Sequence, residues 1–179
     1  MPLPLLIFWV ILYIIAAILL IVTCYVFFIG APFVPTPQRV VDKMIAAADL
    51  RPGMKILDPG CGDGRMLISA VRKFPTIQGV GYELFFVAYI LGWFRTRKYK
   101  KNIQLLFRNS DYADLRGIDR VFCYMLPKPL ARNAAKFKKG LKKGAKIISY
   151  AFQIEGWKPE KIIQSEPKKN YGPIYVYKI

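Results

Sequence analysis

The sequence predicts a doubly wound α/β domain whose seven-stranded sheet is mostly parallel, with an antiparallel C-terminal hairpin and one transmembrane helix in front of it. Three observations support this prediction. An uncharged apolar run opens the chain of 179 residues, short apolar runs then alternate with helical patterns, and two strand-like runs flank a turn at the end. We therefore divide the chain into an anchor (1–30), a proline-rich connector (31–37) and one domain (38–179).

The first element is an apolar run from Leu3 to Ile29 that contains no charged residue. Because a bilayer core about 30 Å thick needs roughly 20 helical residues, this run is long enough to span it. Trp9 and Tyr25 lie where aromatic side chains often anchor a helix at the membrane surface. A cleaved signal peptide is the alternative, but no Lys or Arg precedes the run, it exceeds the usual ~7–15 apolar residues, and no small-residue cleavage site follows.

Charge is distributed unevenly between the anchor and the domain. The chain has 28 Lys and Arg against 11 Asp and Glu, a net charge of +17, yet residues 1–38 contain no charged side chain. Because positive residues tend to stay on the cytoplasmic side, we expect a single-pass membrane protein whose domain faces the cytoplasm. Gly30 and the prolines that follow it should make the connector short and stiff.

The absence of histidine excludes several classes of site. It removes the commonest metal ligand and rules out Ser-His-Asp or Cys-His catalytic arrangements. The three cysteines are scattered along the chain, and a cytoplasmic domain is reducing, so we expect neither a disulfide nor a metal site and interpret all three as packing residues.

The domain should begin with a helix over 37–50, in which Pro37 suits the first turn and Thr36 is the expected N-cap. Apolar residues recur there at helical spacing, and Arg51-Pro52-Gly53 signals the turn that ends it. Further helices are expected at 65–74, from Leu84 onward and at about 129–141. The runs that we expect to be strands are 55–58, 77–83, 103–107, 120–125, 146–152, 162–166 and 174–179. Alternation of helices and strands favours a parallel sheet, and the turn at 167–172 is typical of a hairpin.

A glycine-rich loop follows the first expected strand and opens the next helix. Its glycines let the backbone turn sharply and approach a ligand closely, and the helix amides can bind an anionic group. The loop residues that we expect to contact a ligand are Asp58, Gly60, Cys61, Gly62, Asp63 and Gly64. Where a dinucleotide-binding loop would have a further glycine, this chain has Arg65.

Two more acidic residues follow neighbouring strands. Glu83 ends the second strand, where a carboxylate can bind both ribose hydroxyls, and Asp111 follows the third, where one can accept from an adenine amino group. With Asp58 and Asp63, four of only 11 acids lie at strand ends, which favours a positively charged ligand. S-adenosylmethionine carries a sulfonium and an ammonium besides its ribose and adenine, so it fits this pattern. The alternative for Asp63 and Asp111 is that they only cap helices or turns.

With these motifs the domain resembles a class I S-adenosylmethionine-dependent methyltransferase, which implies a Rossmann-like fold. More narrowly, it is similar to the small membrane-anchored protein-lysine N-methyltransferases that act on the c ring protein of ATP synthase or the adenine nucleotide translocase, and to their prokaryotic relatives. The segments that support the narrower resemblance are Pro32-Phe33-Val34-Pro35-Thr36-Pro37, Leu50-Arg51-Pro52-Gly53, Asp58 to Arg65 and Tyr124-Met125-Leu126-Pro127. This chain departs from most relatives at Pro59 and Cys61, where they have Leu and Ser, and at Tyr150-Ala151, where we expect more polar residues.

The resemblance implies roles for residues on both sides of the transferred methyl group. Thr36 would contact the cofactor S-adenosylmethionine, whose product is S-adenosylhomocysteine. The acceptor pocket would be bordered by Tyr124, Pro127, Phe152 and Trp157. The alternative for Thr36 is helix capping alone, and for Phe152 and Trp157 it is ordinary core packing.

Two basic stretches, 95–101 and 132–146, are dense enough to bind a polyanion. Next to a membrane anchor, anionic lipid headgroups are the favoured partner. Nucleic acid is disfavoured because Tyr124-Met125-Leu126-Pro127 stands where enzymes that methylate amide or nucleobase amino groups have an Asn-Pro-Pro-Tyr type motif. The apolar stretch 84–94 is too short to span a bilayer. It is interpreted as a buried helix or, alternatively, as a segment that dips into the membrane interface.

The sequence therefore predicts a membrane-anchored methyltransferase that modifies a lysine of a membrane-associated protein. One alternative is methylation of a lipid headgroup amine or of a membrane-soluble small molecule. Another is a binding module that keeps the fold without catalysis, against which the intact glycines, Glu83 and Asp111 argue.

Overall fold

The computed structural model describes residues 2–29, 33–164 and 171–179 of the chain. The chain divides into two units, Met1–Pro32 and Phe33–Ile179, and the division falls inside the expected connector. Residues 30–32 of that connector lie outside the described residues, and so do residues 165–170, which contain most of the expected hairpin turn.

The first unit is a single helix, α1 (Leu3–Ile29), with the bounds of the apolar run. The stretch from Leu3 to Cys24 has a mean hydropathy of 3.3, and its side chains are exposed. This helix is long and apolar enough to cross a membrane, and a signal sequence near the N-terminus passes the same test of length and composition. Trp9 is among its exposed side chains, whereas the side chain of Tyr25 lies outside the described part of the chain.

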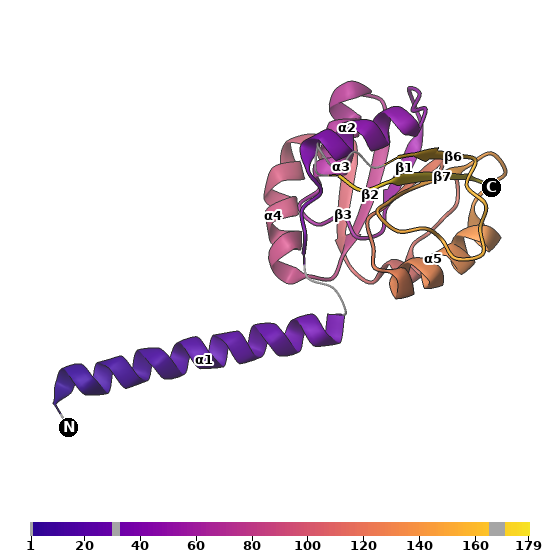
Figure 1. Ribbon diagram of the computed structural model, residues 1–179. Coiled ribbons are helices and arrows are strands. Elements are labelled where there is room, and N and C mark those ends of the chain that lie inside the picture. Colours follow the sequence, from indigo (N-terminus) through magenta and orange to yellow (C-terminus); the bar gives the residue numbers. More distant parts are fainter. Residues whose placement is uncertain (1, 30–32, 165–170) are drawn as a thin grey trace. The chain divides into compact units, whose positions relative to one another are not determined.

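The second unit is built on a seven-stranded sheet with the strand order β3-β2-β1-β4-β5-β7-β6 (Figure 1). The strands are β1 (Lys55–Asp58), β2 (Gln78–Glu83), β3 (Ile103–Phe107), β4 (Arg120–Cys123), β5 (Lys146–Tyr150), β6 (Lys161–Ile163) and β7 (Ile174–Lys178). β1 to β5 pair in parallel, and β7 pairs antiparallel with both β5 and β6. The predicted parallel sheet with an antiparallel C-terminal hairpin is confirmed. Strand order reverses at β1 and β4, and ligands of such sheets bind beyond the carboxyl ends of the strands at this point.

Helices cover both faces of the sheet (Figure 1). They are α2 (Gln38–Ala47), α3 (Arg65–Lys73), α4 (Phe86–Thr96) and α5 (Pro127–Gly140), with short 3₁₀ turns at Arg97–Tyr99 and Ser110–Tyr112. α2 and α3 bury Met44 and Leu67 against the face that carries Ile56, and α5 buries Phe137 against the face that carries Leu57. Consecutive strand residues point to opposite faces, so β1 contributes to both cores.

The start of the domain differs from the prediction at both ends of its first helix. This helix ends at Ala47 rather than Leu50, and Asp49, with a left-handed φ of 51°, turns the chain into the loop that follows. The N-cap is Pro37, not Thr36, and no side chain caps the helix. Pro37 has an extended ψ of 140°, so the helix begins at Gln38 and Thr36 lies one residue too early to cap it.

Two strands and a helix near the expected acceptor pocket also have other bounds than predicted. β4 ends at Cys123 and β5 at Tyr150, so Tyr124 and Phe152 lie in the segments that leave the sheet. α5 begins at Pro127, two residues before the predicted start, because proline suits the first turn of a helix.

α4 differs most from its expected environment. The prediction of a buried helix over 84–94 is wrong, because the helix begins at Phe86 and buries only Ala88, Gly92 and Thr96. These small residues recur every fourth position and form one narrow stripe that packs inward. Larger residues such as Leu91 are about half exposed.

Tyr177 of β7 joins the hairpin to the core below α5. Its side chain is fully buried, its hydroxyl accepts the backbone N–H of Ile154 at 2.8 Å, and its ring meets Trp157 edge-on. The buried side chain of Tyr177 therefore fixes the loop between β5 and β6 to the sheet.

We expect Tyr177→Phe to lower the free energy of unfolding by about 1–3 kcal/mol, because it leaves the buried N–H of Ile154 without an acceptor. Urea unfolding of the detergent-solubilised chain, followed by circular dichroism, measures the change. Tyr175→Phe, at a half-buried position of the same strand, is the matched control. A loss no larger than that of the control would contradict the role of this hydrogen bond.

Candidate active site

The glycine-rich loop joins β1 to α3 at the carboxyl end of the sheet. Gly62 and Gly64 have φ angles of 52° and 75°, a region that favours glycine. The N–H of Cys61 donates to the carbonyl of Tyr82 at 3.0 Å, and the N–H of Gly64 donates to the carbonyl of Cys61 at 2.8 Å. The loop is thus tied both to β2 and to itself.

Asp58, the last residue of β1, places a carboxyl group beneath this loop. It is 7% exposed and accepts the N–H of Gly60 at 3.4 Å. Burial, together with the negative charges of Glu83 and Asp63, raises the pKa of Asp58 to about 7, although the N–H of Gly60 opposes the shift. A buried acid poised near neutral pH can become an anion when a cation binds beside it.

Glu83 at the end of β2 accepts three backbone N–H groups from two segments with one carboxylate. One oxygen, Oε2, accepts the N–H of Gly62 at 2.7 Å, and the other accepts the N–H groups of Leu84 and Phe85 at 2.8 and 2.7 Å. The position of this carboxylate is therefore fixed by the glycine loop and by the entry to α4, which orients it for a ligand at the strand ends.

The carboxylate of Asp63 forms ion pairs with two arginines. Its carboxylate accepts from Nε and Nη2 of Arg65 at 2.9 and 2.7 Å and is also paired with Arg95 of α4. Burial alone would raise the pKa of Asp63, but the hydrogen bonds and positive charges of these arginines outweigh it and lower that pKa. The contacts in the structure thus give Asp63 a bracing role, and its contact with a ligand stays a prediction.

Arg65 also fixes the segment by which the chain enters the domain. Nη1 of Arg65 donates to the carbonyl of Thr36 at 2.7 Å. Three residues earlier, the ring of Phe33 covers Gly62 so closely that a Cβ there would overlap it. Thr36 is half-buried beside the glycine loop, and the structure shows its carbonyl, not its side chain, in a hydrogen bond.

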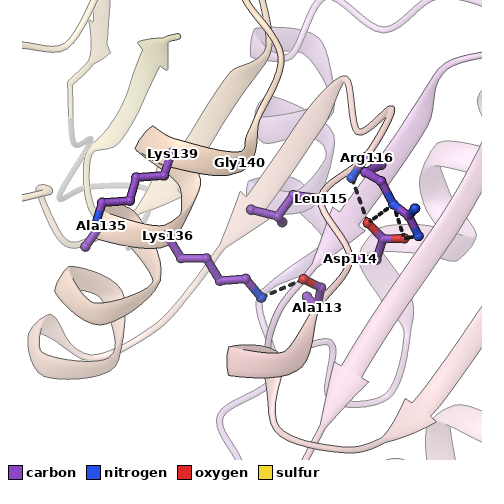
Figure 2. A pocket seen from close by; sticks show the side chains of 8 residues that line it. All are labelled: Ala113, Asp114, Leu115, Arg116, Ala135, Lys136, Lys139 and Gly140. Carbon is purple, nitrogen blue, oxygen red and sulfur yellow. Dashed lines mark hydrogen bonds and ion pairs between the residues drawn. The ribbon is translucent and has the colours of Figure 1, made fainter.

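Asp111 lies in the 3₁₀ turn after β3 and is held by two elements. Asn109 accepts its N–H at 2.9 Å, and Arg132 of α5 donates to its Oδ1 at 2.9 Å. Figure 2 shows the adjoining groove of 540 Å³ between α5 and residues 113–116, across which Lys136 reaches the carbonyl of Ala113. Lys136 also donates to the carbonyls of the turn that carries Asp111, so the groove helps to position that residue.

On the acceptor side, the structure brings two tyrosines together. Register places Tyr124 and Tyr150 at the carboxyl ends of β4 and β5, and their ring centroids are 4.8 Å apart. Burial, and to a smaller extent Tyr150, raises the pKa of Tyr124, so its hydroxyl is neutral at physiological pH. Ala151 follows with a left-handed φ of 67°, and its N–H donates to the carbonyl of Pro173 at 2.9 Å.

The other residues expected to border the acceptor lie elsewhere. Phe152 and Trp157 pack against the core under α5, whereas Tyr124 packs against the core under α2 and α3. Pro127 is exposed at the start of α5. The geometry therefore does not gather these four residues around one point, and their shared role stays a prediction.

The two cysteines of the domain are buried. Cys61 packs against Gly81, where its sulfur leaves no room for a side chain, and Cys123 lies within β4. Burial raises the pKa of both thiols, which keeps them protonated and unreactive. This environment fits the packing role predicted for them.

Residues 58–161 match the protein family described as the ANTKMT methyltransferase domain, and the match covers more than half of the chain. The chain belongs to this methyltransferase family.

Named relatives of this methyltransferase act on lysine. A protein-lysine N-methyltransferase of Saccharolobus islandicus is 29% identical over 157 residues, which are 83% of this chain and 93% of the relative. A lysine N-methyltransferase of Rattus norvegicus that is named for the c-type subunit of ATP synthase is 28% identical over 72% of this chain. An adenine nucleotide translocase lysine N-methyltransferase of Mus musculus is 26% identical over 74%. The chain spans just over half of these two mammalian proteins, 59% and 58%.

Solved structures agree on the fold and on the cofactor. An RNA methyltransferase from Salinibacter ruber in complex with S-adenosyl-L-homocysteine has a TM-score of 0.74 at 25% identity, covering 82% of this chain and 94% of its own. A precorrin-6y C5,15-methyltransferase from Geobacter metallireducens shares the fold, with a TM-score of 0.65 at 18% identity, covering 82% and 88%. The methyltransferase fold of this chain is Rossmann-like, and its cofactor is S-adenosylmethionine.

The residues at the strand ends fit this cofactor. Nothing lies within 4 Å of a Cβ built at Gly60, so the space above the start of the loop is open. Around it stand a buried acid that a cation would ionise and a carboxylate whose position three amides fix. The predicted cofactor residues Asp58, Gly60, Gly62 and Glu83 therefore surround one site, while their individual contacts stay predictions.

Sequence reasoning missed the residues that brace this site. Arg65 and Phe33 were named only as members of the segments that carry the resemblance, with Arg65 also standing where a dinucleotide-binding loop has a glycine. Arg132 and Lys136 were named only within the basic stretch 132–146, which was expected to bind a polyanion, whereas the structure also shows them bonded to the turn that carries Asp111. The one usable signal was Asp63-x-Arg65, because an Asp two residues before an Arg can form a local ion pair. For the others the partners come from segments distant in the sequence, which no local pattern reveals.

We expect Gly60→Ala to leave thermal stability unchanged while it weakens S-adenosylmethionine binding by about tenfold or more, because the added methyl group enters the open space. Gly62→Ala differs, since its φ of 52° and the ring of Phe33 also make it destabilising. Isothermal titration and thermal unfolding of the full chain in detergent separate the two effects. Unchanged affinity of a folded Gly60→Ala variant would place the cofactor elsewhere.

Affinity for S-adenosylmethionine should rise with pH. Because the pKa of Asp58 is about 7 in the free protein and a bound ammonium favours the anion, binding below that pH releases a proton. The dissociation constant should therefore fall by up to about tenfold per unit between roughly pH 5.5 and 7 and then level off. Titrations against pH should give a flat profile for Asp58→Asn. The same slope in that variant would exclude Asp58 as the titrating group.

Proposed function

We propose that this protein is a membrane-anchored S-adenosylmethionine-dependent methyltransferase that methylates a lysine of a membrane-associated protein. The observation that favours a lysine acceptor most is the pair Tyr124 and Tyr150 at the carboxyl ends of β4 and β5, two residues beyond the level of Asp58 at this edge of the sheet. Membership of a family whose relatives are named for lysine methylation supports the same acceptor.

The proposed anchor is α1, with the methyltransferase domain on the cytoplasmic side. Support comes from the length and hydropathy of the helix and from the restriction of all charged residues to positions after Gln38. Two relatives are named for lysine methylation of an ATP synthase component and of the adenine nucleotide translocase, which suggests a membrane protein as substrate here.

Each predicted cofactor residue has a distinct proposed task. Asp58 would hold the ammonium group, Glu83 the ribose hydroxyls, and Asp111 the adenine amino group. Gly60, Cys61, Gly62 and Gly64 would leave room for close approach, while Asp63 and the carbonyl of Thr36 hold Arg65 and thereby the entry segment. When bound, S-adenosylmethionine supplies a methyl group on a positively charged sulfur, which a neutral amine can displace.

The task of the acceptor side is to make the lysine amine neutral. The pKa of a free lysine, near 10.4, is about 3.4 units above pH 7. Deprotonation of its ammonium group at that pH therefore costs roughly 4–5 kcal/mol. Aromatic rings can hold the ammonium by cation–π attraction and shield it from water, and desolvation lowers its pKa. Because Tyr124 itself stays protonated, it adds no negative charge that would favour the ammonium. Proton loss to water then suffices, and alignment of the amine provides the remaining rate enhancement.

Incubation of host membranes with the full chain and methyl-labelled S-adenosylmethionine tests the acceptor class. We expect label in protein, and mass spectrometry should locate it on lysine. Label confined to the lipid extract would favour a headgroup or small-molecule acceptor. Label in RNA would favour the activity for which the Salinibacter ruber enzyme is named. Cofactor binding without any label would favour a non-catalytic module.

We expect Tyr124→Ala to lower kcat/KM for the acceptor by about tenfold or more, with the dissociation constant of the cofactor unchanged within about twofold. Tyr124→Phe keeps the ring that contacts Tyr150 and should retain activity within about threefold. Initial rates at varied acceptor concentration, with thermal unfolding as a folding control, measure the difference. Equal activity of the two variants would remove the aromatic pair from the acceptor site.

A further inference from the structure

α4 presents an apolar outer surface that the domain does not cover. We call the residues Val87, Leu91, Trp93 and Phe94 the α4 patch; they are 56%, 48%, 49% and 52% exposed. The rings of Trp93 and Phe94 meet edge-on at 5.0 Å, so they form one continuous surface. Contiguous exposed apolar side chains of this size on a folded domain mark a contact with something outside it.

The inner side of α4 fixes the direction in which this patch points. A Cβ at Gly92 would lie 2.7 Å from the carbonyl oxygen of Gly62, so the helix backbone rests directly on the glycine loop. Thr96 is buried at the next turn, and Arg95 is paired with Asp63. Rotation of the helix to bury the patch would break these contacts, so its exposure belongs to the folded state.

A band of positive charge borders the patch. Between Glu83 and Asp111 the chain has no acidic residue, and α4 leads directly into a basic cluster. We define this basic cluster as Arg97, Lys98, Lys100 and Lys101, all of which are exposed. The guanidinium of Arg97 lies 5.7 Å from the ring of Phe94, which joins the cluster to the patch.

The helix that carries the patch contacts the same loop as the segment by which the chain enters the domain. The ring of Phe33 covers Gly62, and Gly92 of α4 packs against the carbonyl oxygen of the same glycine. Phe33 itself follows the last residue of α1, Ile29, by only four positions. The entry segment and the inner side of α4, which lies behind the patch, therefore both contact the same glycine loop.

We infer that the α4 patch is inserted into the interface of an anionic lipid bilayer, with the basic cluster held against the headgroups. This inference rests on the proposed anchoring by α1. An apolar helix face with Trp and Phe beside a row of Lys and Arg is the composition of helices that lie about 5–10 Å deep in the interface. The protein would then contact the membrane through α1 and through the α4 patch. The glycine loop packs against the inner side of α4, away from the patch.

Charge argues against a second copy of this chain as the occupant of this surface. A second copy that docked through the same patch would bring its own basic cluster against this one. An anionic bilayer offers acyl chains to the apolar patch and negatively charged headgroups to the basic cluster.

Depth-dependent fluorescence quenching tests the inference on the full chain. Leu91→Cys, in a Cys24→Ser background, is labelled with an environment-sensitive fluorophore; the buried Cys61 and Cys123 are protected. The labelled chain is reconstituted into phosphatidylcholine vesicles with and without phosphatidylglycerol, containing lipids spin-labelled near the headgroup. We expect quenching at position 91 that increases with phosphatidylglycerol, and none for the same label on Lys139→Cys, an exposed position of α5.

Two matched charge reversals test the contribution of the basic cluster. Lys98→Glu, Lys100→Glu and Lys101→Glu together should reduce quenching at position 91 by about half or more. Lys138→Glu, Lys139→Glu and Lys143→Glu change the net charge equally at exposed positions of another face and should leave it unchanged. A uniform response to both sets would overturn the assignment to this cluster.

The remaining outcomes separate this inference from the proposed anchor. If the chain resists alkaline extraction from vesicles but position 91 is unquenched, or is quenched no more than position 139, the α4 contact is wrong and the anchor stands. Self-quenching that grows with protein density would instead assign the patch to a second copy. Release of the chain by alkaline extraction would refute the anchor, and the inference with it.

Discussion

The carboxylate of Asp63 is the interaction on which the rest of the site depends. It accepts from Arg65 at the start of α3 and pairs with Arg95 of α4, and Arg65 in turn holds the carbonyl of Thr36. One buried acid therefore joins the entry segment, the glycine loop and α4. In a chain with a net charge of +17, such a clustered use of acids also limits the repulsion between cations that the fold brings together.

The sequence predicted the sheet well because its strands are short, buried and bounded by turn residues. The bounds of β1 and β3 are those predicted, and the register brings Asp58 and Glu83 to the same edge. The predictions that failed depended on contacts between distant segments. Nothing near Thr36 shows that Arg65 takes its carbonyl, and nothing in 84–94 shows that only every fourth residue packs inward.

The residues of the site that a sequence can single out are limited in a similar way. Gly60, Gly62 and Glu83 could be proposed because a glycine loop between a strand and a helix is a local pattern, and a carboxylate at the end of the next strand is evident once that strand is recognised; their contacts with the cofactor stay predictions. The acceptor residues depend on which sheet face each side chain joins. Phe152 and Tyr124 turn to different cores, and a shift of one residue at the end of a strand decides this.

Ala151 has a consequence for how an acceptor would be received. A non-glycine residue in the left-handed region costs on the order of 1 kcal/mol, and here the carbonyl of Pro173 holds it in place. The backbone that leaves β5 is therefore shaped while the chain folds, before any partner arrives. An acceptor bound at the proposed site beside Tyr150 would meet a preformed wall, so less conformational entropy would be lost on docking than with a glycine at this position.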